Sequence, residues 1–147
     1  MRGLGVIIFC MLFFSCAGKP PEDIGLHNEQ LADCPNSPNC VASQTTDAAH
    51  SIVPFEYKGE KKMAFVKLKK VIASLDSMTL VTENDQYLHF ECKSAIMGFV
   101  DDLEFYFPDD PPGEKTIQVR SASRLGYSDF GVNRKRVEQL RKLFAAE

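Results

Sequence analysis

Two cysteines, Cys34 and Cys40, stand close together in the stretch CPNSPNCVASQ. Such a pair could form a disulfide, supply half of a zinc site or take part in redox chemistry. Zinc sites usually need two cysteine or histidine pairs, and only His27 and His50 are near. Catalytic redox pairs usually have the spacing C-x-x-C, whereas here it is C-x5-C. In an oxidising compartment we expect a structural disulfide, worth roughly 2 to 2.5 kcal/mol on the chain-entropy model, with zinc and redox chemistry as the alternatives.

A second set of polar residues centres on Asp101. As a hydrolase, the protein would use Asp101 as general base beside Ser123, with an arginine (Arg124 or Arg136) stabilising charge. A serine nucleophile needs an adjacent base that a third group orients, and this set meets the requirement only in part. We favour a structural network over a pocket whose arginines hold an anionic group. The candidate cluster comprises Ser94, Asp101, Ser121, Ser123, Arg124, Tyr127, Asp129, Asn133 and Arg136.

Hydrophobic periodicity predicts the elements that must position these residues. Helical spacing of apolar residues indicates helices over 61–75 and over 133–145, the second with Asn133 as a plausible N-cap. Between them, alternation predicts four strands, at 78–84, 86–96, 98–107 and 115–124. A short edge strand is expected before the first helix, at 52–57. The order predicts an α+β fold: an antiparallel sheet of four or slightly more strands with two main helices packed on one face.

The predicted register brings the polar side chains together, because a one-residue slip would turn every side chain to the wrong face. The turn DDPPGE places Asp101 opposite Ser123, and a tight Met97-Gly98 turn places Ser94 opposite Asp101. Three strands therefore meet at one end of the inner face. On the outer face we expect solvated side chains at His89, Asp102, Glu104 and Tyr106, while Cys92 faces inward as a buried thiol.

The N-terminal residues have the form of a secretory signal. Arg2 precedes an apolar run over residues 4–14, which is too short to span a bilayer. The run ends in FFSC and resembles a bacterial lipobox, which implies cleavage before Cys16 and lipid on that residue. The alternatives are a plain signal peptide or an uncleaved anchor. We therefore divide the chain into a signal peptide (1–15), a polar tether (16–33) and a single globular domain (34–147).

The amino-acid composition limits the kinds of partner that we expect for the protein. The chain has 17 basic and 20 acidic side chains without a basic block, so we expect no nucleic-acid partner. We expect no cofactor and no metal site. The expected partners are a membrane, through lipid on Cys16, and either an unknown envelope protein or a small ligand, which could be anionic. The expected location is the bacterial cell envelope, facing the periplasm or the exterior, and a non-catalytic role is favoured over an enzyme.

Three motifs resemble a bacterial family catalogued as domain of unknown function 1499. They are CPNSPNCVASQ, GFVDDLEF and VRSASRLGYSDFGVNRKR, and the resemblance runs from about Leu31 to Phe144. The family pattern maps onto Cys34, Pro35, Pro38, Asn39, Cys40, Phe99, Asp101, Asp102, Glu104, Arg120, Ser121, Ser123, Arg124, Gly126, Asp129, Gly131, Asn133 and Arg136. The resemblance implies an envelope location, since many members are lipoproteins, and it leaves the activity open.

Overall fold

The computed structural model describes residues 18–95, 97–109 and 115–147. The elements are β1 (Cys40–Ala42), β2 (Phe55–Glu56), α1 (Lys61–Ala73), β3 (Met78–Glu83), β4 (Tyr87–Lys93), β5 (Val100–Tyr106), β6 (Thr116–Ser123) and α2 (Val132–Ala146). The predicted signal peptide and Cys16 lie outside the described residues.

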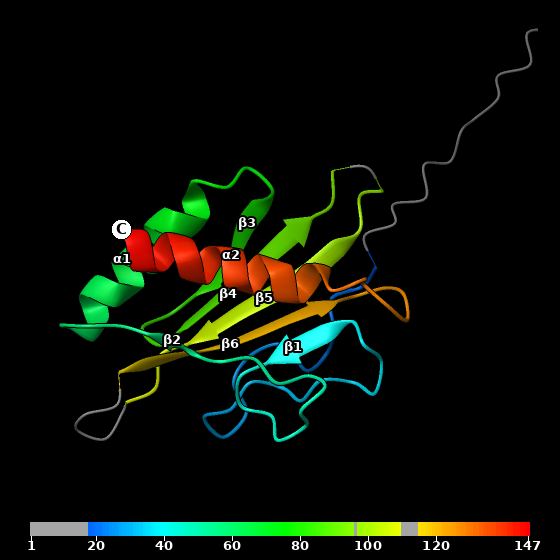
Figure 1. The fold of residues 1–147 in the computed structure, drawn as a ribbon, viewed down its shortest axis with the longest axis horizontal. Helices are drawn as coiled ribbons and strands as arrows, with labels where there is room; N and C mark the ends of the chain where they lie inside the picture. The colour runs from blue at the N-terminus through cyan, green and yellow to red at the C-terminus, as the bar shows by residue number, and fades with distance from the viewer. Residues whose placement is uncertain (1–17, 96, 110–114) are drawn as a thin grey trace, which may run out of the picture.

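The strands form one antiparallel sheet, and both helices cover the same face of it (Figure 1). The strand order is β1-β6-β5-β4-β3, and β2 pairs with the first residues of β6. The α+β prediction is therefore confirmed. The four main predicted strands are β3 to β6, the short strand expected over 52–57 is β2, and β1 was not predicted.

The hydrophobic core lies between the sheet and the two helices. Both helices bury residues spaced three or four apart, as the apolar periodicity requires: Ala64, Leu68, Val71 and Ile72 from α1, and Val137, Leu140 and Phe144 from α2. The sheet contributes aromatic rings, and those of Phe55 and Phe105 meet edge to face with centroids 5.6 Å apart. This geometry is favoured between aromatic rings.

The predicted register is correct for one strand pair and wrong for the other. Asp101 pairs with Ser123, and Leu103 with Ser121, as expected. Between β4 and β5, however, Asp101 pairs with Cys92, not with Ser94. The register is therefore shifted by two residues, and an even shift keeps every apolar side chain on its expected face.

The cause of this shift is a longer turn than the one expected at Met97-Gly98. The backbone N–H of Ser94 donates to the carbonyl of Phe99 at 2.8 Å, and the Ser94 hydroxyl accepts from the N–H of Phe99 at 2.9 Å. Four residues therefore separate the paired ends instead of two. Ser94 closes an exposed turn and does not join the polar cluster on the inner face.

The outer face of the sheet is covered, and the prediction of a solvated face is wrong. His89, Asp102, Glu104 and Tyr106 are all buried. The segment expected to be a tether contacts this face: Leu31 packs with Tyr87 and Tyr106, and the N–H of Gly25 donates to Glu104 at 2.9 Å. Side chains that alternation assigns to solvent are thus shielded by residues far away in the sequence.

Candidate functional site

The inner polar cluster joins two strands of the sheet to α2. Arg136 donates to Asp101 Oδ2 at 2.5 Å, to Asn133 Oδ1 at 2.6 Å and to the Ser121 hydroxyl at 3.1 Å. The Ser121 hydroxyl in turn donates to Asn133 Oδ1 at 2.5 Å. We call this set the inner network: Asp101, Ser121, Ser123, Asn133 and Arg136. It connects β5 and β6 to the first turns of the helix.

Asn133 is the centre of this network and is fully buried. Its amide nitrogen donates to the Ser123 hydroxyl at 2.9 Å, to Asp129 Oδ2 at 2.9 Å and to the backbone carbonyl of Asn39 at 3.1 Å. A buried amide needs all its hydrogen bonds because an unpaired polar group is costly to bury. The side chain thus fastens α2 both to the sheet and to the loop that precedes β1.

Asp129 performs the capping role that the sequence assigned to Asn133. Its carboxylate accepts from the N–H of Gly131 at 2.9 Å and of Asn133 at 2.7 Å. An acceptor at this position satisfies N–H groups that the first turn of a helix leaves unpaired. The helix begins one residue earlier than predicted, at Val132 after Gly131, whose φ of 78° is left-handed.

The inner network contains the groups that a hydrolase would need, but they are committed to each other. Asp101 and Ser123 face each other across the β5–β6 pair, yet Asp101 binds Arg136 and the Ser123 hydroxyl accepts from Asn133. Of the predicted cluster, three residues lie elsewhere. Ser94 is in the turn described above, Tyr127 is exposed on the loop before α2, and Arg124 reaches the outer face.

A second network, which the sequence reasoning missed, lies under the N-terminal segment on the outer face. His89 donates to Asp102 Oδ1 at 2.8 Å, and Arg124 binds both oxygens of Asp102 at 2.7 and 2.8 Å. Arg124 also binds Glu91 at 2.6 Å. Burial raises the pKa of Asp102, but the hydrogen bonds from Arg124 and His89 outweigh it and hold the pKa below its ordinary value. The carboxylate therefore stays ionised at neutral pH.

Glu104 forms the other half of this outer network. It accepts from the Tyr87 hydroxyl at 2.7 Å, from Arg120 at 2.9 Å and from the N–H of Gly25. Burial, together with the negative charge of Glu104, raises the pKa of Tyr87 above its ordinary value, so the phenol stays a donor. Glu104 and Arg120, which lie opposite each other across the β5–β6 pair, thus form a buried ion pair. The feature of the sequence that could have revealed the outer network is the placement of acidic and basic residues on the same face of neighbouring strands.

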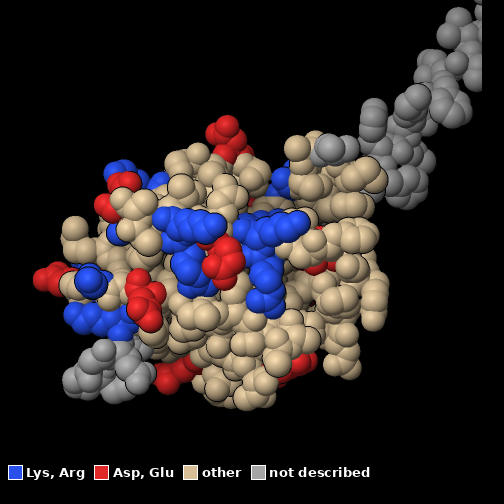
Figure 2. Space-filling view, in the orientation of Figure 1, with Lys and Arg blue, Asp and Glu red and all other residues tan. Residues whose placement is uncertain are grey.

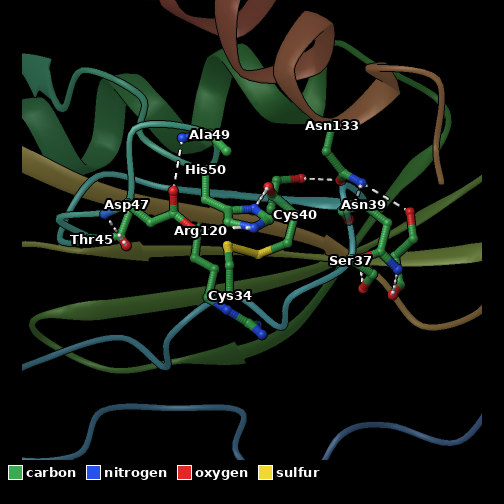
Figure 3. Close-up of a disulfide and its surroundings, with 12 residues drawn as sticks. Cys34, Ser37, Asn39, Cys40, Thr45, Asp47, Ala49, His50, Arg120 and Asn133 are labelled. Carbon is green, nitrogen blue, oxygen red and sulfur yellow. Dashed lines mark hydrogen bonds and ion pairs between the residues drawn. A yellow bond between two sulfur atoms is a disulfide. The ribbon is translucent and has the colours of Figure 1, made fainter. Parts of the chain in front are cut away.

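The disulfide between Cys34 and Cys40 is present, and it holds the loop before β1 beside the inner network (Figure 3). Inside this loop, the Asn39 side chain donates to the carbonyl of Gly126 at 2.7 Å. His50 is buried, and its Nδ1 donates to the carbonyl of Cys40 at 2.9 Å. Cys92 is a free, buried thiol as expected, and burial raises its pKa to about 11.

A groove that no motif indicated lies between α1, α2 and the segment around β2. It has a volume of about 860 Å³ and is mainly apolar. Phe55, Ala64 and Phe144 form its buried floor, and Val53, Met63 and Val66 form exposed apolar walls. The sequence could not indicate it because α2, which completes the groove, is distant in the chain from the β2 segment and α1.

Cationic side chains stand around this groove. Lys67 Nζ lies 4.8 Å from the centre of the Phe144 ring, and the Arg141 guanidinium lies 4.5 Å from that of Phe55. Arg141 also donates to the carbonyls of Val53 and Pro54 at 2.5 and 2.7 Å. Arg141 therefore fastens the β2 segment to α2 and keeps the groove in shape.

A family model described as "Protein of unknown function (DUF1499)" matches residues 30–144. The chain belongs to the DUF1499 family. Among proteins of curated function, none matches the sequence significantly. The DUF1499 match covers the whole sheet, the inner network and most of the groove lining, and it ends within α2.

The residues that carried the DUF1499 resemblance account for much of both networks. Asp101, Ser121, Ser123, Asn133 and Arg136 belong to the inner network, while Asp102, Glu104, Arg120 and Arg124 belong to the outer one. Asn39 and Gly126 hydrogen-bond to each other in the two loops that adjoin them. In this DUF1499 chain the motif residues therefore explain how the domain is held together, and the groove stands apart from them.

Two further observations concern metals and membranes. Within residues 18–95, 97–109 and 115–147, no three His, Cys, Asp or Glu side chains are arranged to hold a metal ion. In the same part of this DUF1499 chain, no helix has both the length and the apolar character needed to cross a bilayer.

Proposed function

We propose that the chain is an exported bacterial lipoprotein whose domain binds a small amphiphile, with an apolar chain and an acidic headgroup, without converting it. The signal-like N-terminus and the FFSC motif support export and lipidation at Cys16. The Cys34–Cys40 disulfide also supports export, because disulfides persist mainly in oxidising compartments. The observation that carries the binding proposal is the groove between α1, α2 and β2.

The groove suits a single apolar chain. Ligand sites typically have volumes of about 300 to 1,000 Å³ and are lined mainly by apolar side chains with a few polar groups, and this groove has about 860 Å³. Val53, Met63 and Val66 expose their side chains on its walls. A contiguous exposed apolar surface of this kind marks a binding site more often than a scattered one does.

The charge around the groove favours an acidic headgroup. The two helices carry ten basic side chains and one acidic one, a net charge of +9, whereas the whole chain carries −3, which leaves −12 on the rest. Figure 2 shows Lys and Arg side chains gathered over the helical face. The charged side chains that line the groove itself are Lys58, Lys67, Lys70 and Arg141 against Glu56 and Glu147, and Glu147 pairs with Lys70. A carboxylate or phosphate would therefore meet attractive charge at the rim.

The inner network is a weaker candidate for the site of action. Asp101, Ser123 and Arg136 already hydrogen-bond within the domain, and each would have to leave its partner to act on a substrate. A hydrolase that uses Asp101 as general base beside Ser123 remains the alternative function. The two candidate functions are distinguished by whether substitution of Asp101 changes turnover or only stability.

The binding proposal is tested with a fluorescent fatty acid and the purified mature protein. Val66→Glu places a carboxylate in the exposed apolar wall of the groove, and we expect it to raise the Kd by about tenfold, or about 1.4 kcal/mol. Val81→Glu is the matched control, because Val81 is also exposed but lies on β3, outside the groove. Failure of the unaltered protein to bind the probe, or equal weakening by both substitutions, would contradict the proposal.

The hydrolase alternative is tested with chromogenic esters and the variant Asp101→Asn. If Asp101 is structural, the variant has a lower melting temperature, and folded protein binds the fatty acid as before. If Asp101 is a general base, the unaltered protein hydrolyses an ester, and the variant folds but loses turnover. Hydrolysis that disappears in this way would replace the non-catalytic proposal.

A further inference from the structure

Exposed apolar side chains gather at one end of the sheet, away from the groove. The loop between β6 and α2 exposes Tyr127 by 75% and Phe130 by 89%. The turn between β4 and β5 lies beside this loop, since the N–H of Arg124 donates to the carbonyl of Val100 at 3.3 Å. Other exposed apolar side chains from the same loop and turn are Leu125, Met97 and Phe99.

The loop holds Phe130 outward at a cost in backbone strain. Phe130 has a φ of 54°, in the left-handed region that a bulky residue rarely adopts. Hydrogen bonds hold this conformation: Asn39 binds the carbonyl of Gly126, and the N–H of Phe130 donates to the Ser128 hydroxyl at 3.2 Å. A rigid loop that presents an almost fully exposed ring suggests that the ring has an apolar partner.

The described chain begins beside this loop. Gly18 packs against Arg124 and Leu125 so closely that an added Cβ would lie 3.1 Å from each side chain. Cys16 lies two positions before Gly18, and two extended residues span at most about 7 Å. Figure 1 shows the loop before α2 at the opposite end of the molecule from the C-terminus. A lipid on Cys16 would therefore hold this end against a bilayer.

We propose that the loop of residues 125–130 inserts its apolar side chains into the surface of the bilayer that anchors Cys16. This inference rests on the lipid anchor of the proposed function. Aromatic side chains favour the interface between lipid and water, and Tyr127 and Phe130 provide two of them. The acidic residue of the loop does not oppose insertion as a free charge, because Asp129 is hydrogen-bonded to the backbone of α2. Docking in this orientation leaves the groove directed away from the membrane.

The chain contains no tryptophan, so a single introduced tryptophan reports on its own surroundings. Phe130→Trp is prepared in the full chain, and the lipidated product is reconstituted into vesicles of phosphatidylcholine and phosphatidylglycerol, with and without brominated acyl chains. We expect emission from position 130 to shift to shorter wavelength in vesicles and to lose intensity when the chains are brominated. Intact mass, measured on the same sample, reports acylation.

The matched control is Leu143→Trp. Leu143 is also exposed, but it lies eleven residues after Val132 along α2, about 17 Å along the helix axis. Its emission should be unaffected by brominated lipid. Acylated protein in which position 130 is unquenched, or in which both positions are quenched equally, would overturn the insertion while leaving the anchor intact. A chain purified from bacterial membranes without acyl groups would overturn both.

Discussion

Asp102 is a fully buried carboxylate that depends on two basic partners. His89 and Arg124 supply three hydrogen bonds to its two oxygens. Removing one member of a buried ion pair leaves the other charge without a partner, whereas a pair on the surface can be lost with little effect. The outer network should therefore contribute strongly to stability, and its contribution should depend on pH.

Asp102→Asn should lower the free energy of unfolding by about 3 kcal/mol near neutral pH. The folded state holds the pKa of Asp102 below its ordinary value, so the stabilisation is complete above an unfolded pKa of about 3.9 and is lost as the pH falls through the folded value. The difference between variant and unaltered protein should therefore narrow in acid. Urea unfolding at about pH 7 and about pH 3 measures both quantities.

Glu83→Gln is the control for this prediction, since Glu83 pairs with Lys69 at 2.7 Å on the surface. It should change the free energy of unfolding by less than about 1 kcal/mol. The assigned role of the outer network would be contradicted if Asp102→Asn changed the free energy of unfolding as little as the control does. A larger change in acid than at neutral pH would contradict it too.

At the scale of elements, α2 is fastened to the sheet by polar contacts at its start and by apolar contacts along its length. Asn133 provides the polar attachment, and Val137, Leu140 and Phe144 provide the apolar stripe. The same network fixes the loop before β1, which the disulfide closes. The first turn of α2 and this loop therefore form one unit, although they lie about 90 residues apart in the sequence.

Asn133→Ala should destabilise the protein by about 3 kcal/mol, because several buried groups lose their partner and each unpaired group costs about 1 to 3 kcal/mol. Gln139→Ala, on the exposed side of the same helix, should change stability by less than about 0.5 kcal/mol. Thermal and urea unfolding of both variants provide the measurement. Similar, small effects for the two substitutions would mean that the inner network does not hold α2 in place.

At the scale of the whole molecule, charge and apolar surface are unevenly distributed. The helices carry a net charge of +9, and they flank the groove. The loop of residues 125–130 and Gly18, which packs against it, lie at the end of the fold opposite the groove (Figure 1). In the proposed arrangement one end meets the membrane and the other is free to take up a ligand, which requires that the chain be anchored through its N-terminus.

Cys16→Ala should abolish acylation and release the protein from the membrane fraction, since lipid attachment needs that thiol. Cys10→Ala is the matched control: Cys10 lies within residues 1–15, which we expect to be removed, so this variant should remain acylated. Membrane flotation and intact mass measure both outcomes. A Cys16→Ala protein that still floats with membranes and retains residues 1–15 would favour an uncleaved anchor instead.

The sequence by itself determined the features that depend on local periodicity and short spacing. Apolar residues at helical or alternating spacing predicted both helices and the four main strands, and the short spacing between Cys34 and Cys40 predicted their disulfide. The β5–β6 register was also predictable, because the apolar faces and the turn agreed on the pairing of Asp101 with Ser123. These properties are set by residues that are close in the chain or by a single face-matching rule.

Only the tertiary structure decided the rest. The β4–β5 register is shifted by two residues, which face matching permits because side chains repeat with a period of two. Asp102 and Glu104 are buried because residues 18–33 cover a sheet face that alternation assigns to solvent. The groove exists because α1, α2 and the β2 segment meet in space. Each of these depends on contacts between distant segments, which no local pattern in the chain records.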